Sequence, residues 1–219
     1  MNGWNIGIGW ADITPEIGEF CSIRMVPGKK STGIHDRLAA NAVVLEKNSK
    51  RLVLLSADAV QIPDDVVRLI KTPLMERYGL AEEEIVIQAT HAHHAPDIVG
   101  EEFVENRHQI TRLVDGCVGA VIEGFENRIP SLIGWGSVMV ASATNRFQWR
   151  TGGRHIKRVD RRIDLLKITD TAGNHRCLVW HFAAHPTTAM RDGFETSRDY
   201  YGEVNDILEA EDRKSTRLN

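Results

Sequence analysis

The segment Arg51-Leu-Val-Leu-Leu-Ser56 decides the fold class of this sequence. Its central residues are all apolar, which is typical of a β-strand buried on both faces. Residues 40–46 are also mostly apolar, and the polar residues 47–50 between the two segments predict a β-hairpin. A strand buried on both faces needs cover on both sides, and we expect helices to supply it. The sequence therefore predicts an α/β domain in which helices cover a layered mixed sheet.

Hydrophobic periodicity places the other elements around this hairpin. We expect strands at residues 5–14, 84–89, 131–141, 163–169 and 177–183. Residues 64–78 predict a helix kinked at Pro73, and residues 103–125 predict a second helix. The second helix carries one apolar stripe at helical spacing, formed by Ile110, Leu113, Val114, Cys117, Val118, Val121, Ile122 and Phe125. No repeat or linker divides the chain, so one domain is expected.

The composition is that of a globular protein, with 219 residues of which 42% are hydrophobic and 26% charged. The three cysteines, Cys21, Cys117 and Cys177, lie far apart, and we expect buried small residues rather than zinc ligands. A net charge of −3 gives no attraction for nucleic acid. The first ten residues do not resemble a secretory signal, and no run of eighteen apolar residues occurs, so we expect no transmembrane segment and a cytoplasmic location. The oligomeric state stays open.

The last eight residues, Asp212-Arg-Lys-Ser-Thr-Arg-Leu-Asn219, differ from the rest of the chain. They follow a helical segment but have no stop signal, cap or apolar pattern of their own. The string resembles translated sequencing-library adaptor, so we expect residues 212–219 to be a non-native tail and residues 1–211 to be the native part.

Two histidines follow the predicted strand at residues 84–89. If the chain stays extended, His91 and His93 project from the same face of the strand end. Neutral imidazole is a good zinc ligand, so this pair is a candidate metal site. The spacing alone is weak evidence, because the chain contains nine histidines. The alternative is a polar loop with surface histidines.

A second candidate lies at the end of the strand at residues 177–183. His185 follows this strand, and Pro186 prevents its regular continuation. We expect His185 to be a ligand and His181 to be a core histidine. No glutamate follows His181, which excludes the zinc-protease motif His-Glu-x-x-His. The sequence also has no nucleophilic serine elbow, phosphate-binding loop or dinucleotide fingerprint.

Two further polar positions could support chemistry. Arg146, which follows Asn145, could place a guanidinium over a carbonyl oxygen or a developing oxyanion. Asp58 follows the apolar strand that ends near Ser56 and is either support for the site or a turn residue. An exposed arginine in a basic loop is the alternative for Arg146.

Six short motifs occur in a characteristic order. They are Ala11-Asp-Ile-Thr-Pro15, Gly33-Ile-His-Asp-Arg37, Ser56-Ala-Asp58, Thr90-His-Ala-His93, Asn145-Arg146 and His181-Phe-Ala-Ala-His-Pro-Thr187. This series resembles the N-terminal landmarks of the neutral/alkaline non-lysosomal ceramidases. The resemblance implies the N-terminal part of a larger catalytic domain, whose remaining zinc ligands lie beyond this sequence. We therefore expect an incomplete active site in this chain.

The resemblance also implies roles for four residues. His91 and His185 would be zinc ligands, His93 would assist proton transfer at the scissile amide, and Arg146 would contact the substrate or the reacting centre. The expected cofactor is Zn²⁺, which would activate water for hydrolysis of a carboxamide bond. The expected substrate is a small-molecule or lipid amide. His94-Ala95 stand where these ceramidases usually carry Ser-Gly, so both a ceramide-like N-acyl amide and a smaller amide stay open.

Several alternatives are compatible with these residues. Asp97, Glu101 and Asp199 are conceivable third ligands, and the sequence selects none of them. The chain could instead be a metal-free binding or assembly domain. It could also belong to a zinc esterase or lactonase, because the same metal and water attack any polarised carbonyl.

Overall fold

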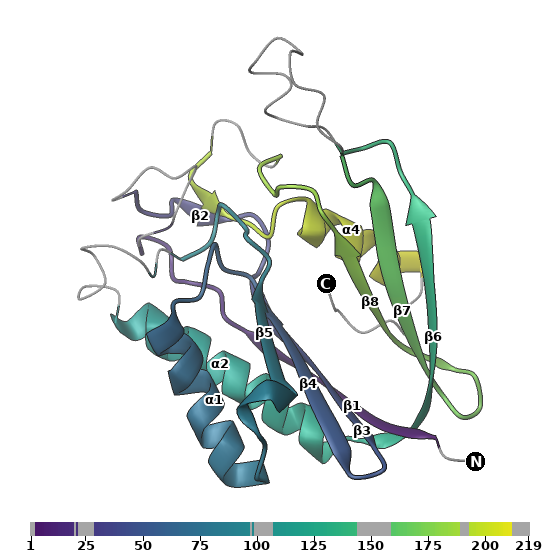
Figure 1. The fold of residues 1–219 in the computed structure, drawn as a ribbon. Helices are drawn as coiled ribbons and strands as arrows, with labels where there is room; N and C mark the ends of the chain where they lie inside the picture. The colour runs from purple at the N-terminus through teal and green to yellow at the C-terminus, as the bar shows by residue number, and fades with distance from the viewer. Residues whose placement is uncertain are drawn as a thin grey trace.

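The computed structural model describes residues 3–19, 21, 29–96, 98, 107–143, 159–188 and 193–211. Within these ranges, one sheet has the strand order β5-β4-β3-β1-β6-β7-β8, and a two-stranded sheet pairs β2 with β9 (Figure 1). The strands are β1 (Trp4–Asp12), β2 (Gly33–Ile34), β3 (Ala39–Lys47), β4 (Lys50–Ala57), β5 (Ile85–Ala89), β6 (Ile129–Met139), β7 (Arg162–Asp170), β8 (His175–Phe182) and β9 (Glu195–Thr196). The helices are α1 (Asp64–Tyr78), the short 3₁₀-helix η2 (Glu82–Glu84), α2 (Arg107–Glu126) and α4 (Tyr200–Glu211).

The predicted α/β class and most predicted elements are confirmed. The hairpin β3–β4 is antiparallel, and β5 pairs with β4 in parallel, so the sheet is mixed. α1 spans residues 64–78 and runs through Pro73 as one helix. The described part of α2 begins at Arg107, and the predicted start at residues 103–106 lies outside the described residues. The three cysteines are buried and free, as expected.

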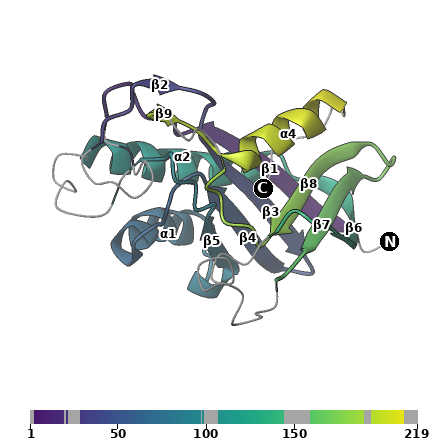
Figure 2. The same ribbon diagram turned by 90° about the horizontal axis from the view of Figure 1, so that it is seen from above.

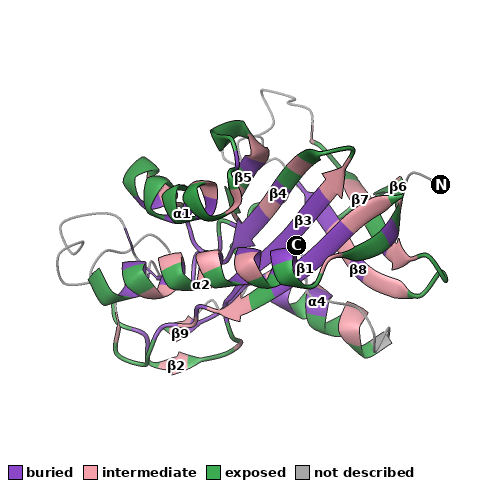
Figure 3. Cartoon of the chain, turned by 90° about the horizontal axis from the view of Figure 1, so that it is seen from below, coloured by how far each residue is buried: buried purple, intermediate pink, exposed green. Residues whose placement is uncertain are grey.

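Helices α1 and α2 cover one face of the sheet (Figure 3). Small residues on β1 allow α2 to approach closely: a Cβ atom at Gly7 or Gly9 would collide with the backbone of Gly124 or Ala120. The core on this face combines Ala40, Ala42, Val44, Val53 and Leu55 of the sheet with Val66, Ile70, Leu74, Cys117, Ala120 and Val121 of the helices.

The other face of the sheet is covered by the sheet itself, so the expectation of helices on both sides is wrong. Strands β7 and β8 curl over β1 and β3, and Ile168 and Cys177 form one buried cluster with Ile6, Ile8 and Val43. Figures 1 and 2 show β6, β7 and β8 turning away from the plane of β3 and β4. Sheet twist accumulates from strand to strand, which allows one sheet to supply two facing layers.

Helix α4 packs on the outer side of β8. Trp180 and Phe182 are buried there against Tyr200, Tyr201 and Val204, and Nε1 of Trp180 donates a hydrogen bond to Oδ1 of Asn205. Residues on β8 therefore alternate between a face toward β1 and β3 and a face toward α4.

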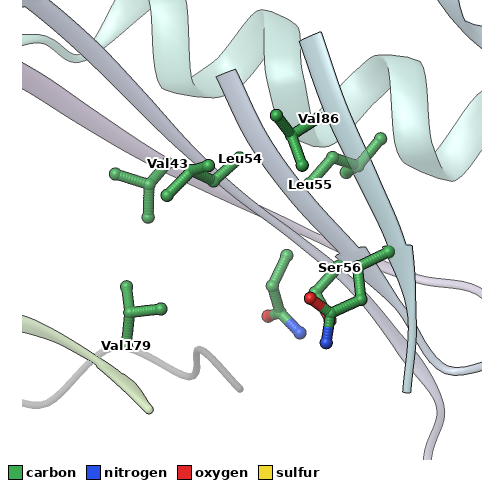
Figure 4. Close-up of a pocket in the computed structure, with 8 residues that line it drawn as sticks. Val43, Leu54, Leu55, Ser56, Val86 and Val179 are labelled. Carbon is green, nitrogen blue, oxygen red and sulfur yellow. The ribbon is translucent and has the colours of Figure 1, made fainter. Parts of the chain in front are cut away.

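A groove remains between β8 and the strands β3, β4 and β5, because the curled strands do not reach the far edge of the sheet (Figure 4). The groove is lined by Asn41, Val43, Leu54, Leu55, Ser56, Val86, Gln88 and Val179. None of the helices in the described part of the chain has an apolar stretch long enough for a membrane crossing.

Candidate metal centre

Three histidines predicted as site residues come together at one point. The ring nitrogens that His91, His93 and His185 could offer to a metal all lie within 4.8 Å of one another. The ring centroids are 4.7 to 5.0 Å apart. His91 and His93 follow β5, whereas His185 follows β8, so the two edge strands of the curled sheet contribute to one site. We call these three residues the histidine cluster.

His91 reaches the cluster through a turn and not through continued strand geometry. β5 ends at Ala89, and His91 has a φ of 65°, in the left-handed region. The expectation of an extended chain from His91 to His93 is therefore wrong, although the two rings do converge. The backbone N–H of His91 donates to the carbonyl of Ala59 at 2.9 Å, and Nδ1 lies 2.6 Å from the carbonyl oxygen of Val60. A carbonyl can only accept, so Nδ1 carries the proton and the lone pair is on Nε2.

Asp58 supports the turn that carries His91. Its buried carboxylate accepts hydrogen bonds from the backbone N–H of Ala39 at 2.8 Å and from Oγ1 of Thr90 at 3.1 Å. Burial raises the pKa of Asp58 to about 6, although the Ala39 hydrogen bond and the positive charge of Arg198 act in the opposite direction. Asp58 thus holds the residue that immediately precedes His91.

His93 is the buried member of the cluster, with 5% of its surface exposed. Burial, followed by the neighbouring rings of His185, His91 and His94, lowers the pKa of His93 to about 4. In the part of the chain that the structure describes, Nε2 of His93 is buried without a hydrogen-bond partner. Three converging imidazoles, one of which has a buried ring nitrogen without a hydrogen-bond partner among the described residues, fit a bound cation better than a structural core.

His185 lies three residues beyond the end of β8. Its Nδ1 is 3.2 Å from Oγ1 of Thr187, and the following Pro186 is buried. His181 is exposed on β8 and is not part of the cluster, so its expected place in the core is wrong.

The other predicted site residues have different outcomes. Arg146 and Asn145 lie outside the described residues, as do Asp97, Glu101 and the proposed tail at residues 212–219. Asp199 is described, but it is not one of the residues grouped around the potential metal position. It supports the turn after His185. The sequence offers only an Asp before a helical segment as a signal for this role.

Comparison with known proteins identifies the family. The family described as neutral/alkaline non-lysosomal ceramidase, N-terminal, matches residues 4–219. The chain belongs to this family. It is 26% identical to the neutral ceramidase of Oryza sativa subsp. japonica, over 93% of this chain and 28% of that protein. It is 23% identical to neutral ceramidase A of Dictyostelium discoideum, over 92% of this chain and 31% of that protein.

Solved ceramidase structures have the same fold. The crystal structure of neutral ceramidase from Pseudomonas aeruginosa matches with a TM-score of 0.83 and 23% identity, over 96% of this chain and 36% of that chain. A ceramidase complexed with C2 matches with a TM-score of 0.82 and 23% identity. This ceramidase-family chain therefore spans about a third of the length of the relatives that it matches.

Proposed function

We propose that this chain carries the histidine part of a zinc-dependent amide hydrolase acting on a ceramide-like N-acyl amide or a smaller amide. The observation that carries the proposal is the histidine cluster, in which possible ligand nitrogens of His91, His93 and His185 all lie within 4.8 Å of one another. Membership in the ceramidase family supports an amide bond as the target. The relatives extend well beyond the matched region, so we propose that hydrolysis also needs segments corresponding to that remainder.

In this proposal, His91 and His185 hold zinc. Nε2 of His91 carries the lone pair because Nδ1 donates to the Val60 carbonyl. The hydroxyl of Thr187, 3.2 Å from Nδ1 of His185, can accept a hydrogen bond from Nδ1 and so leave Nε2 of His185 to zinc. When bound, zinc would lower the pKa of a water molecule and polarise the scissile carbonyl.

His93 is proposed to move the proton. Its lowered pKa keeps the ring neutral at pH 7, so it can accept a proton from the attacking water and pass it to the leaving nitrogen. Arg146 is proposed to stabilise the carbonyl oxygen, as its place in the family motif suggests.

Zinc stoichiometry of the purified protein in its natural length tests this proposal, with His181→Ala as the matched control because His181 is an exposed histidine on β8 outside the cluster. We expect His91→Ala and His185→Ala to lose bound zinc and His181→Ala to retain it. Stoichiometric zinc in either cluster variant would refute the proposed ligands. A wild-type protein of natural length without zinc would favour a metal-free binding domain.

A substrate panel tests the reaction class. The protein in its natural length should release amine from N-acyl amides of long and short acyl chains, and His93→Gln should lose this activity while keeping zinc. Hydrolysis of esters or lactones without any amide cleavage would favour the zinc esterase or lactonase alternative.

A further inference from the structure

Asp199 stands out as a buried, strained carboxylate beside the histidine cluster. It is 1% exposed and immediately precedes α4. Its φ of 59° is in the left-handed region, where residues other than glycine persist only when surrounding contacts hold them. The charge of Asp199 acts on His93 by raising its pKa, against the larger effects of burial and the other histidines.

The carboxylate of Asp199 holds the turn that follows His185. Thr188 donates to it twice, from the backbone N–H at 2.9 Å and from Oγ1 at 2.8 Å. The backbone N–H of Tyr200 donates to the same carboxylate at 2.7 Å. Asp199 therefore joins the first turn of α4 to the chain only three residues after His185.

The backbone of Asp199 is held in turn. Its N–H donates to Oγ of Ser197 at 3.0 Å, and the N–H of Ser197 donates to the carbonyl of His94 at 2.9 Å. This places Asp199 at a fixed position relative to the turn that carries His93. Through these hydrogen bonds, residues 197–199 connect the turn that carries His93 to the turn that follows His185.

We propose that Asp199 is the positioning residue of His185, fixing the turn 185–188 so that Thr187 accepts from Nδ1 and the lone pair of Nε2 points into the cluster. A ligand role is less compatible with the structure, because the carboxylate oxygens already accept from Thr188 and Tyr200 and lie outside the potential metal group. The orientation of the ring is independent of zinc, whereas the effect on zinc affinity rests on the proposed function.

Histidine side-chain NMR of the metal-free chain at pH 8 tests the orientation, because long-range ¹H–¹⁵N correlations distinguish the two neutral tautomers. We expect wild-type His185 to be protonated at Nδ1 alone. Asp199→Asn tolerates the left-handed backbone but turns an amide donor toward Thr188, and it should give a mixture of tautomers. Thr188→Val should also give a mixture, whereas Thr188→Ser should restore the wild-type spectrum.

Asp170→Asn is the matched control, because Asp170 also accepts backbone hydrogen bonds at a turn but is the last residue of β7, at the β7–β8 turn away from the cluster. An unchanged His185 spectrum in both Asp199→Asn and Thr188→Val would overturn the proposal, as would a wild-type His185 protonated at Nε2. If Asp199→Asn does not fold, Thr188→Val and Thr188→Ser decide.

Zinc titration separates this inference from the proposed function. We expect Asp199→Asn to weaken zinc binding by about tenfold or more, the usual effect of losing support behind a ligand. A wild-type protein of natural length that binds no zinc, together with the predicted tautomer changes, would refute the zinc site and leave the positioning role intact. Zinc binding with no change at His185 in any variant would refute the positioning role alone.

Discussion

His93 has the environment least like that of a free imidazole among the three clustered histidines. Burial and the rings of His185 and His91 disfavour its protonated form and lower its pKa to about 4. We predict that NMR titration of the metal-free chain finds His93 uncharged down to about pH 5. In His185→Ala, water enters and one neighbouring ring is lost, so the pKa should rise toward 6.5. A wild-type value near 6.5 would contradict the described burial.

The raised pKa of Asp58 predicts that the free energy of unfolding falls as the pH rises, which is opposite to the effect of most carboxylates. Its pKa is about 6 in the folded chain and near 3.8 when exposed, so the folded state binds the proton more tightly. This stabilising contribution is complete below pH 3.8 and disappears as the pH rises through 6. Relative to Asp58→Asn, the wild-type free energy of unfolding should fall by up to about 3 kcal/mol between pH 4 and pH 7.

Urea titrations of both proteins across this pH range measure the difference. Comparing the two chains removes the contributions of other titrating groups, such as Asp12 and Glu19, whose pKa values are lowered by hydrogen bonds and by Arg37 and Arg112 despite partial burial. A constant difference between pH 4 and pH 7 would show that Asp58 is ionised without penalty.

The sequence predicts which histidines matter better than it predicts how they meet. His91, His93 and His185 stand out because each follows an apolar strand. Their convergence depends on the left-handed backbone at His91 and on the carbonyl of Val60, which lies 31 residues earlier in the sequence. The role of Asp199 depends on contacts with Thr188 that no local pattern reveals.

At the scale of the elements, β1 and α2 lie close together. Gly9 faces the backbone of Ala120, and an added methyl group has no space there. We predict that Gly9→Ala lowers the free energy of unfolding by about 2 kcal/mol or more, because the helix must move away from the strand. Gly134→Ala on β6 is the control, since its Cβ meets open space. The urea midpoints of the two variants should differ clearly, and equal midpoints would rule out the tight contact.

The local elements were predictable because their signals are local. The apolar hairpin β3–β4 and the amphipathic α2 follow from periodicity alone. The two-residue strands β2 and β9 have no such pattern, since their pairing joins Gly33 to Glu195 across the sequence. The packing of β7 and β8 over the second face of the sheet also could not be predicted, because it depends on how strongly the sheet curls.

At the scale of the whole molecule, the groove beside β5 leaves apolar surface uncovered. Val86 is 47% exposed on this edge strand, next to Leu54. Apolar edge strands favour association with other chains. We predict that the 219-residue chain self-associates at micromolar concentration and that Val86→Thr, which keeps the β-branched shape, shifts it toward monomer in sedimentation velocity.

Leu69→Gln is the control for this prediction, because Leu69 is 55% exposed on α1, away from the groove. Equal sedimentation of the wild type and Val86→Thr would assign any self-association to another surface. A monomeric wild-type chain would show that the uncovered strand is protected from pairing.

The strand order has a mechanical consequence. β1 pairs with β3 along eight residues but with β6 along only three, so a short seam joins the helix-covered half of the sheet to the half that carries His185. The histidine cluster lies where the two outermost strands meet again. An ion bound there would link the ends of the two outermost strands. Its coordination geometry would depend on the angle between the two halves of the sheet at the β1–β6 seam. Substitutions at the β1–β6 seam would then change the affinity for the ion without contacting its ligands.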